Sequence, residues 1–166
     1  MIRLVPVLLA LAACSAAGPS QKRSATPSGG AHIVDRAHLL PAATTSALDA
    51  KLRGFELATR HQIVVVTLPS LEGRSIEEAS HVLGTELQVG RAREDDGVLL
   101  LVALGDRQVR LSVGDGLTGQ LTPSGMAHIL DRDIRPAFHA RNFPKGISDG
   151  VDALVQALTP TRGTTT

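Results

Sequence analysis

Four aspartates and one arginine are the residues whose types and spacing could do chemistry. Asp95 and Asp96 stand directly before an apolar run, and Asp115 follows the next run along the chain. Carboxylate oxygens are the hard ligands that Ca²⁺ and Mg²⁺ prefer, so a divalent-cation site is one interpretation, with Asp35 joining if its segment lies nearby. The spacing is not that of an EF-hand loop. The alternative is that Asp95, Asp96 and Gly97 form a solvated turn ahead of a strand.

A strand pair is expected to position these acids. Residues 98–104 form a continuous apolar run, which is typical of a strand buried on both faces. Residues 108–113 alternate between apolar and polar side chains, as in a strand with one face less buried. Gly105 and Asp106 between them suit a tight turn, because both tolerate positive φ.

The register of this hairpin decides which acids meet. With a two-residue turn, Leu104 pairs with Arg107, and counting outward places Asp96 opposite Asp115 at the open end, with Asp95 beside them. Like charges directly opposite destabilise a sheet. The hairpin must therefore separate these acids, solvate them, protonate one of them, or neutralise them with a cation.

Phosphoryl chemistry is a second use for such residues. A bound cation could lower the pKa of a water, and Arg107 or Arg110 could pair with phosphate oxygens in fork geometry. The alternative is that Arg107 caps its turn or solvates a sheet edge. The sequence holds no Walker-type phosphate loop. Its six histidines are scattered, without an HxH or HExxH pattern, and are expected on the surface or on helix faces: His32, His38, His61, His81, His128 and His139.

The elements around the hairpin indicate an α/β fold. Residues 62–68 are rich in β-branched side chains and predict a strand. Ser75 and Glu78 form a capping box that starts a helix to about Leu87. A strand, a crossover helix and the strand at Val98 form a parallel, right-handed unit. Since both strands are buried on two faces, we expect a central mixed β-sheet with helices packed on both faces, a three-layer sandwich.

Three further helices complete the expected domain. The first follows Pro41 and buries Leu48, Leu52 and Phe55. The second starts at Thr122 as N-cap and is ended or kinked at Arg135 by Pro136. The third covers residues 144–158.

Composition excludes several partners. Lys and Arg total 17 against 16 Asp and Glu, a net charge of +1, which argues against nucleic acid as the main partner. Aromatic residues make up 2% of the chain, with no Trp or Tyr, so stacking platforms are not expected. A single Cys excludes an intramolecular disulfide and a cysteine-based zinc cluster.

That cysteine has a specific interpretation. A short basic start and an apolar core precede Leu11-Ala12-Ala13-Cys14, which resembles the bacterial lipobox. We expect residues 1–13 to be a lipoprotein signal peptide and Cys14 to be lipidated, with Ser15 favouring the outer membrane. The alternative is an ordinary secretory peptide. Residues 14–31 are expected to be a flexible tether, 32–158 the folded domain and 159–166 a disordered tail.

The ordered motifs of the domain resemble a known family. The segments that carry the resemblance are Val34-Asp35 with Leu39-Leu40, residues 62–68, Leu71 to Glu78, Asp95 to Leu100, Asp106 to Arg110, Gly114 to Leu117, Pro136 to Phe138, and Gly146-Ile147. In this order and spacing they are similar to the TPM domain, named for a thylakoid lumen phosphatase, a photosystem II repair protein and a nematode receptor modulator. The similarity covers roughly residues 33–158.

The resemblance implies an α/β sandwich on a membrane-tethered, extracytoplasmic protein. It also implies calcium or magnesium binding through acidic loop residues in some relatives, and phosphatase activity in plant members. Asp95, Asp35 and Arg107 match family positions. Asp96 stands where Asn is usual and Asp115 where an aromatic residue is common. Arg141-Asn142-Phe143 replaces the usual Gly-Asp-Tyr, and we expect the lipid anchor to replace the C-terminal membrane helix of many bacterial relatives.

Together these observations predict a lipoprotein of the bacterial cell envelope whose domain faces the periplasm. We expect a binding or accessory module that contacts an envelope protein partner and holds a divalent cation weakly through Asp95, Asp96, Asp115 and Asp35. The alternative is a metal-dependent acid phosphatase.

Overall fold

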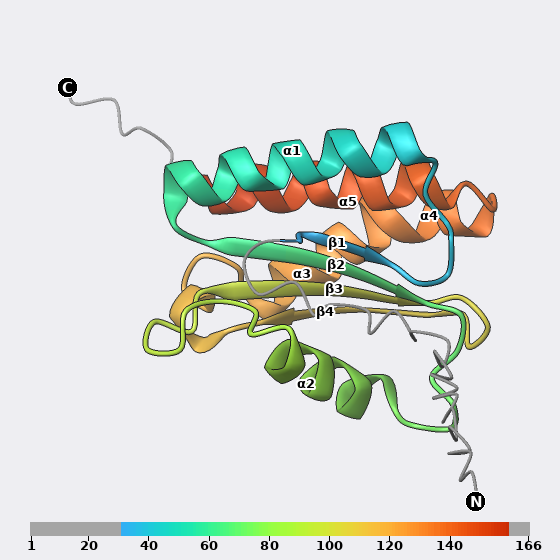
Figure 1. Cartoon of the computed structure of the whole chain (residues 1–166), viewed down its shortest axis with the longest axis horizontal. Helices are drawn as coiled ribbons and strands as arrows, with labels where there is room; N and C mark the ends of the chain where they lie inside the picture. Colours follow the sequence, from blue (N-terminus) through green and yellow to red (C-terminus); the bar gives the residue numbers. More distant parts are fainter. Residues whose placement is uncertain (1–30, 160–166) are drawn as a thin grey trace, which may run out of the picture.

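A computed structural model describes residues 31–159 of the chain, which form a four-stranded sheet covered by helices on both faces (Figure 1). The predicted signal peptide, Cys14 and nearly all of the tether, as well as residues 160–166, lie outside the described residues. The predicted α/β fold with a central mixed sheet is confirmed. Among the described residues, no helix is both long and apolar enough to cross a membrane.

Two fully packed strands form the centre of the sheet. β2 (Gln62–Leu68) and β3 (Gly97–Ala103) run parallel, and from Ile63 and Gly97 onward every residue of both strands is buried. The short β1 (Ile33–Asp35) lies parallel to β2 on one side. β4 (Gln108–Val113) pairs antiparallel with β3 on the other, so the strand order is β1-β2-β3-β4.

Helices cover the two faces of this sheet unequally. α1 (Ala42–Thr59) and α5 (Phe143–Leu158) lie side by side on one face, together with α3 (Pro123–Ile129), while α2 (Ile76–Glu86) covers the other face (Figure 1). Alternate residues of each central strand enter opposite cores, so that Leu100 packs under α1 and α5, and Leu99 packs against α2. The core under α1 and α5 is mostly aliphatic with Phe55 among its buried members, and the core under α2 is wholly aliphatic.

The crossover helix begins as its sequence predicts. The Glu78 N–H donates to Ser75 Oγ over 3.1 Å, and the Ser75 N–H donates to the Glu78 carboxylate over 3.2 Å. This is the reciprocal capping box, which satisfies two backbone donors at the helix start. The helix ends at Glu86, with Leu87 as its C-cap.

The helix after Thr122 does not stop at Arg135, so of the two predicted outcomes an end of the helix is not what occurs, and the helix instead changes type just before Pro136. After α3 the chain forms a π-helical turn, η2 (Leu130–Ile134), and continues as α4 (Arg135–His139). The Arg135 N–H bonds to Leu130 O, five residues back, instead of the residue four back. This wider turn accommodates the proline ring and its missing donor, which an α-helix would not.

The β3–β4 register is the predicted one, but the turn is built differently. Ala103 pairs with Gln108 and Val98 with Val113. Positive φ occurs at Arg107, at 53°, and at neither Gly105 nor Asp106. Gly105 is needed for space, because a Cβ there would lie 2.7 Å from the Pro69 carbonyl oxygen.

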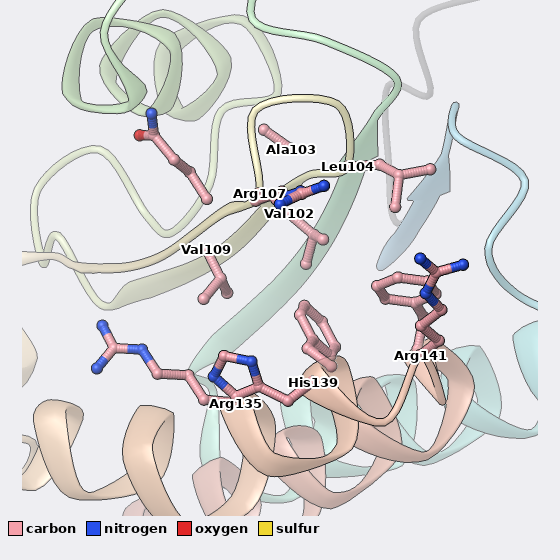
Figure 2. Close-up of a pocket in the computed structure, with 11 residues that line it drawn as sticks. Val102, Ala103, Leu104, Arg107, Val109, Arg135, His139 and Arg141 are labelled. Atoms are coloured by element: carbon pink, nitrogen blue, oxygen red, sulfur yellow. The ribbon is translucent and has the colours of Figure 1, made fainter.

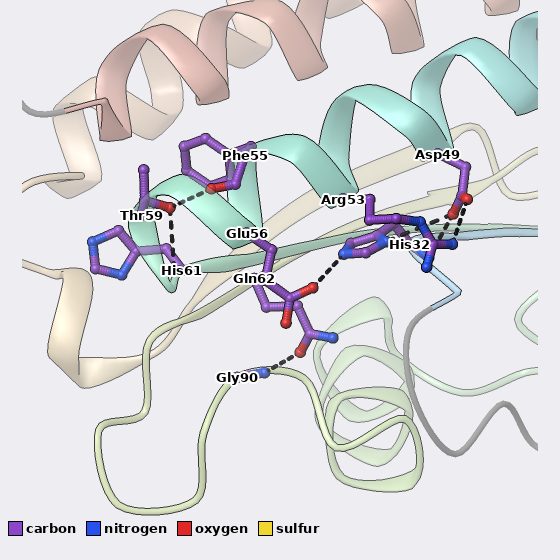
Figure 3. A network of polar contacts seen from close by, with 9 residues as sticks. All are labelled: His32, Asp49, Arg53, Phe55, Glu56, Thr59, His61, Gln62 and Gly90. Carbon is purple, nitrogen blue, oxygen red and sulfur yellow. Dashed lines mark hydrogen bonds and ion pairs between the residues drawn. The ribbon is translucent and has the colours of Figure 1, made fainter.

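Where β1 begins, His32 is buried, with 1% of its surface exposed. Its ring Nε2 lies 2.7 Å from Glu56 Oε2, and its backbone N–H donates to Asp49 Oδ1 over 3.2 Å (Figure 3). The surface placement expected for this histidine is therefore wrong. The contacts hold the start of β1 against α1, at the point where the described domain begins.

Two helix glycines give a matched test of this packing. A Cβ on Gly150 in α5 would lie 2.6 Å from the buried Ile134 side chain, whereas one on Gly54 in α1 would meet nothing within 4 Å. We expect Gly150→Ala to lower the free energy of unfolding by about 1–3 kcal/mol through overpacking. Gly54→Ala should raise it by up to about 1 kcal/mol through helix propensity. Urea denaturation measures both, and equal effects would contradict the packing of α5 on η2.

Candidate functional site

The acidic residues gather at the open end of the β3–β4 hairpin, which we call the hairpin mouth (Asp95, Asp96 and Asp115). The Gly114 N–H donates to Gly97 O over 2.9 Å, which extends the pairing and sets Asp96 opposite Asp115, as predicted. The carboxylates of Asp95 and Asp96 nevertheless bond to different partners, which relieves the charge repulsion expected between the facing aspartates.

Asp96 is neutralised inside the protein. Its carboxylate is 3% exposed and accepts from Arg91 Nε at 2.8 Å, from Arg91 Nη2 at 2.5 Å and from the Arg91 backbone N–H at 2.8 Å. Burial by itself raises the pKa of Asp96, but the hydrogen bonds from Arg91 outweigh burial and leave the pKa below its ordinary value of 3.8. Asp96 thus holds the loop before β3 and has no free oxygen face for a cation.

Asp95 and Asp115 remain exposed at the hairpin mouth. Asp95 takes a left-handed backbone with φ of 45°, and its Oδ2 accepts the Asp115 N–H over 2.9 Å. Asp115 opens a short 3₁₀ turn, η1 (Asp115–Leu117). A Cβ on Gly114 would lie 2.1 Å from Asp95 O, so only glycine lets the two segments approach this closely.

Asp35 lies at the opposite end of the strands from the hairpin mouth. It is the last residue of β1, and because β1 and β3 both run parallel to β2, the end of β1 lies far from the start of β3. Its carboxylate accepts the Leu39 N–H at 3.0 Å, the Leu40 N–H at 2.9 Å and the Thr67 hydroxyl. The structure therefore does not bring Asp35 to the other three acids. In the part of the chain that the structure describes, no three His, Cys, Asp or Glu side chains are grouped to hold a metal ion.

Arg107 belongs to a different site, at the turn end of the hairpin. It lines a pocket of about 760 Å³ whose other cationic side chains come from α4 and the turn that follows it (Figure 2). The pocket is floored by apolar side chains, and Val102 and Val109 point from the hairpin toward the helix that carries Arg135 and His139. We call this site the basic pocket. Its cationic lining residues are Arg107, Arg135, His139 and Arg141, and its apolar lining includes Val102, Val109, Phe138 and Phe143.

The charges of the basic pocket are largely unopposed. Arg135 pairs with Asp131, one helical turn away. Within residues 31–159, Arg107 and Arg141 form no ion pair with an Asp or Glu, and no carboxylate lines the pocket. Both arginines also have left-handed φ, 53° and 57°. Such backbone is uncommon for residues other than glycine, but five further residues of the described chain share it, so it does not by itself mark the pocket.

Sequence reasoning found Arg107 but missed its neighbours. Arg135, His139 and Arg141 are far from Arg107 in the chain, and only the packing of α4 beside the hairpin brings them together. One signal was present, because Arg141 and Phe143 stand at the motif that departs from Gly-Asp-Tyr. The π-helical turn, which sets the direction of α4, had no signature that the pattern of apolar residues could reveal.

These features define a small three-layer α/β domain with an acidic hairpin mouth and an open basic pocket at opposite ends of one hairpin. A family model described as the TPM domain matches residues 33–157. The chain belongs to the TPM-domain family, as its motifs predicted.

Three solved structures are similar to this chain. The N-terminal domain of a protein from P. gingivalis is 31% identical, with a TM-score of 0.72 over 77% of this chain and 82% of that one. The N-terminal domain of cg2496 from Corynebacterium glutamicum is 13% identical, with a TM-score of 0.62 over 90% and 89%. BA42 from Bizionia argentinensis is 22% identical, with a TM-score of 0.62 over 72% and 81%. The last two show the fold alone, and no curated protein matches the sequence.

The two adjacent aspartates give a test of the hairpin mouth. We expect Asp96→Asn to lower the free energy of unfolding by about 1–3 kcal/mol at neutral pH, because a buried charge-assisted hydrogen-bond set is lost. Asp95→Asn, the same change at an exposed neighbour whose amide oxygen can still accept the Asp115 N–H, should change it by less than about 0.5 kcal/mol.

Acid should remove this difference. The Asp96 pKa is lower in the folded state than its ordinary value of 3.8, so its stabilising contribution is complete above that value and disappears as the pH falls through the folded-state pKa. Urea denaturation at a series of pH values should show wild type and Asp96→Asn converging below about pH 4. A constant difference down to pH 2 would contradict the Arg91–Asp96 assignment.

Proposed function

We propose that this chain is a lipid-tethered module of the bacterial cell envelope, more specifically of the outer membrane, and that it binds an anionic group of an envelope partner in the basic pocket. The observation that carries this proposal is the pair of unopposed guanidinium groups, Arg107 and Arg141, over an apolar floor. The tether through Cys14 rests on the sequence pattern, and Cys14 lies outside the described residues.

The position of the pocket supports a binding role. It lies at the carboxyl end of the parallel strand β3, where Val102, Ala103 and Leu104 line it. In open α/β sheets, ligands bind in the crevice outside these strand ends. A guanidinium that no carboxylate neutralises can pair with a carboxylate or phosphate through two parallel hydrogen bonds. The site therefore matches an anionic ligand with an attached apolar part.

A divalent cation at the hairpin mouth is a second, weaker proposal. The Asp96 carboxylate is already bonded to Arg91, and Asp35 lies at the opposite end of the strands. Asp95 and Asp115 are therefore the two remaining candidate ligands for a cation. Dedicated calcium sites use six to eight oxygens, whereas Mg²⁺ often keeps most of its waters and binds through one or two carboxylates. Asp95 and Asp115 therefore fit a loosely held, largely hydrated cation.

The distance between the two sites weighs against a combined phosphatase site. The hairpin mouth adjoins Gly97 and the basic pocket adjoins Ala103, so the length of β3, about 20 Å, separates them. A cation at Asp95 and Asp115 would not reach a phosphate held by Arg107. The metal-dependent phosphatase thus remains the alternative, but its expected cation ligands and its expected phosphate-binding arginine lie at opposite ends of the hairpin.

Binding of simple anions tests the proposed pocket. We expect benzoate and phenyl phosphate to shift amide NMR resonances around Val109 and Phe138, because both probes carry an anion and an apolar ring. Arg107→Gln and Arg141→Gln should each weaken binding about tenfold, the size of one charge-assisted contact. Arg93→Gln, an equal charge change at an exposed arginine near the hairpin mouth, should leave binding unchanged.

The same experiment addresses the alternative. Phenyl phosphate should stay intact during the titration. Release of inorganic phosphate that requires calcium or magnesium, and that Asp95→Asn abolishes, would overturn the binding module in favour of the phosphatase. Equal binding by all three arginine variants would place the anion outside the pocket.

Thermal unfolding tests the cation. We expect millimolar Ca²⁺ or Mg²⁺ to raise the midpoint relative to chelator, by an increment equivalent to about 1.4 kcal/mol at ten times the dissociation constant. Asp95→Asn should remove the increase. Glu72→Gln, an equal charge change at an exposed acid in the loop before α2, should preserve it. If Glu72→Gln removes it as well, the ion acts through general screening and the site is refuted.

A further inference from the structure

The edge of the sheet beside the basic pocket is open. Among the described residues β4 is an edge strand, with β3 on one side and no strand on the other. Successive residues of an antiparallel pair alternate in direction, and the Gly114 N–H points to Gly97 O. The backbone groups of Val109, Leu111 and Val113 therefore point away from β3, and among the described residues they form no backbone hydrogen bond with another segment.

This open edge leads directly into the basic pocket. The backbone N–H and C=O of Val109 point away from β3, and Val109 also lines the pocket. The polar side chains along the rest of β4 already have partners. Arg110 pairs with Glu77 at 2.7 Å, and Ser112 Oγ lies 2.6 Å from Ser80 Oγ. Unopposed positive charge is therefore concentrated where the edge ends, at Arg107 and Arg141.

The size and lining of the pocket indicate more than an inorganic anion. Its volume of about 760 Å³ lies in the range of sites that enclose organic groups. Phe138 and Phe143 line it, with ring centroids 5.2 Å apart and planes at 68°, and they are two of the three phenylalanines in the chain. With Val102 and Val109 they offer an apolar surface beneath the arginines.

We propose that the β4 edge and the basic pocket together bind the C-terminal segment of a partner protein. The segment adds to β4 as an antiparallel strand, which runs toward the Gln108 end and so brings its terminal carboxylate to Arg107 and Arg141. Its last apolar side chain enters the pocket between Val109 and Phe138. Strand addition supplies main-chain hydrogen bonds, and the pocket selects the free carboxylate. The inference rests on the proposed anion-binding function and specifies its ligand.

Peptides test this mode with the purified full chain. The probe is an acetylated peptide as long as β4, of alternating threonine and valine, ending in leucine with a free carboxylate. Fluorescence anisotropy of a labelled version should show binding, and the matched C-terminal amide should bind at least about tenfold more weakly, because the charge-assisted pairs are lost. Arg107→Gln and Arg141→Gln should reduce this discrimination, while Arg93→Gln should keep it.

Backbone pairing is tested separately from the carboxylate. N-methylation at the peptide positions whose N–H faces β4 should weaken binding about tenfold, and N-methylation at the alternate positions should not. Val113→Pro removes a backbone N–H that points away from β3, and edge strands tolerate proline. This variant should weaken peptide binding as much as N-methylation at the peptide positions that face β4. The N-methylated peptides need no altered protein, so they decide the question even if this variant fails to fold.

Each other outcome has a distinct meaning. If carboxylate and amide peptides bind equally, or if acetyl-leucine alone binds as tightly as the peptide, C-terminal strand capture is refuted. If phenyl phosphate binds in the pocket and no peptide does, the occupant is a small organic anion, so this inference fails while the proposed function stands. If neither peptides nor the anion probes bind, both fail together.

Discussion

The burial of β2 and β3 on both faces is the constraint on which the rest of the structure depends. From Ile63 and Gly97 onward, these strands expose no residue to water, so each needs a helical layer above and below. Thr67 is a polar residue among these buried positions, and its hydroxyl donates to the Asp35 carboxylate and accepts the Ala37 N–H at 3.1 Å. Two strands packed in this way leave no room for unpaired polar groups on their faces. β2 and β3 therefore carry no charged side chain, and the charges of the β3–β4 hairpin lie at its two ends and at Arg110 in β4.

The two strand ends of the β3–β4 hairpin have opposite charge and different degrees of compensation. At the hairpin mouth, Arg91 neutralises Asp96, and one carboxylate oxygen of Asp95 accepts the Asp115 backbone N–H. At the turn end, Arg107 and Arg141 have no acidic partner within residues 31–159. A charge that is already paired gains little from a ligand, because binding must first replace the existing contacts. The basic end is thus the better prepared of the two for binding.

The sequence predicted the elements and the register better than it predicted the site. Local patterns specified β2, the capping box of α2 and the pairing of β3 with β4, since each depends on residues close in the chain. The partner of Asp96 was missed although Arg91 is only five residues away, because the contact depends on how the loop folds back. The π-helical turn and the meeting of Arg107 with Arg141 depend on tertiary packing between distant segments. Sequence periodicity contains no information on such contacts.

The motif at residues 141–143 connects the site to the family. The family resemblance implies Gly-Asp-Tyr at the position where this chain has Arg141-Asn142-Phe143. Asn142 retains a helix-capping role, since its side-chain oxygen accepts the Lys145 N–H at 3.3 Å. Arg141, directly before this cap, lines the basic pocket and adds positive charge to it, while Phe143 directly after it supplies part of the apolar lining. The three-residue segment therefore combines the start of α5 with two side chains of the pocket, so a substitution at Arg141 changes the charge of the pocket and leaves the Asn142 cap in place.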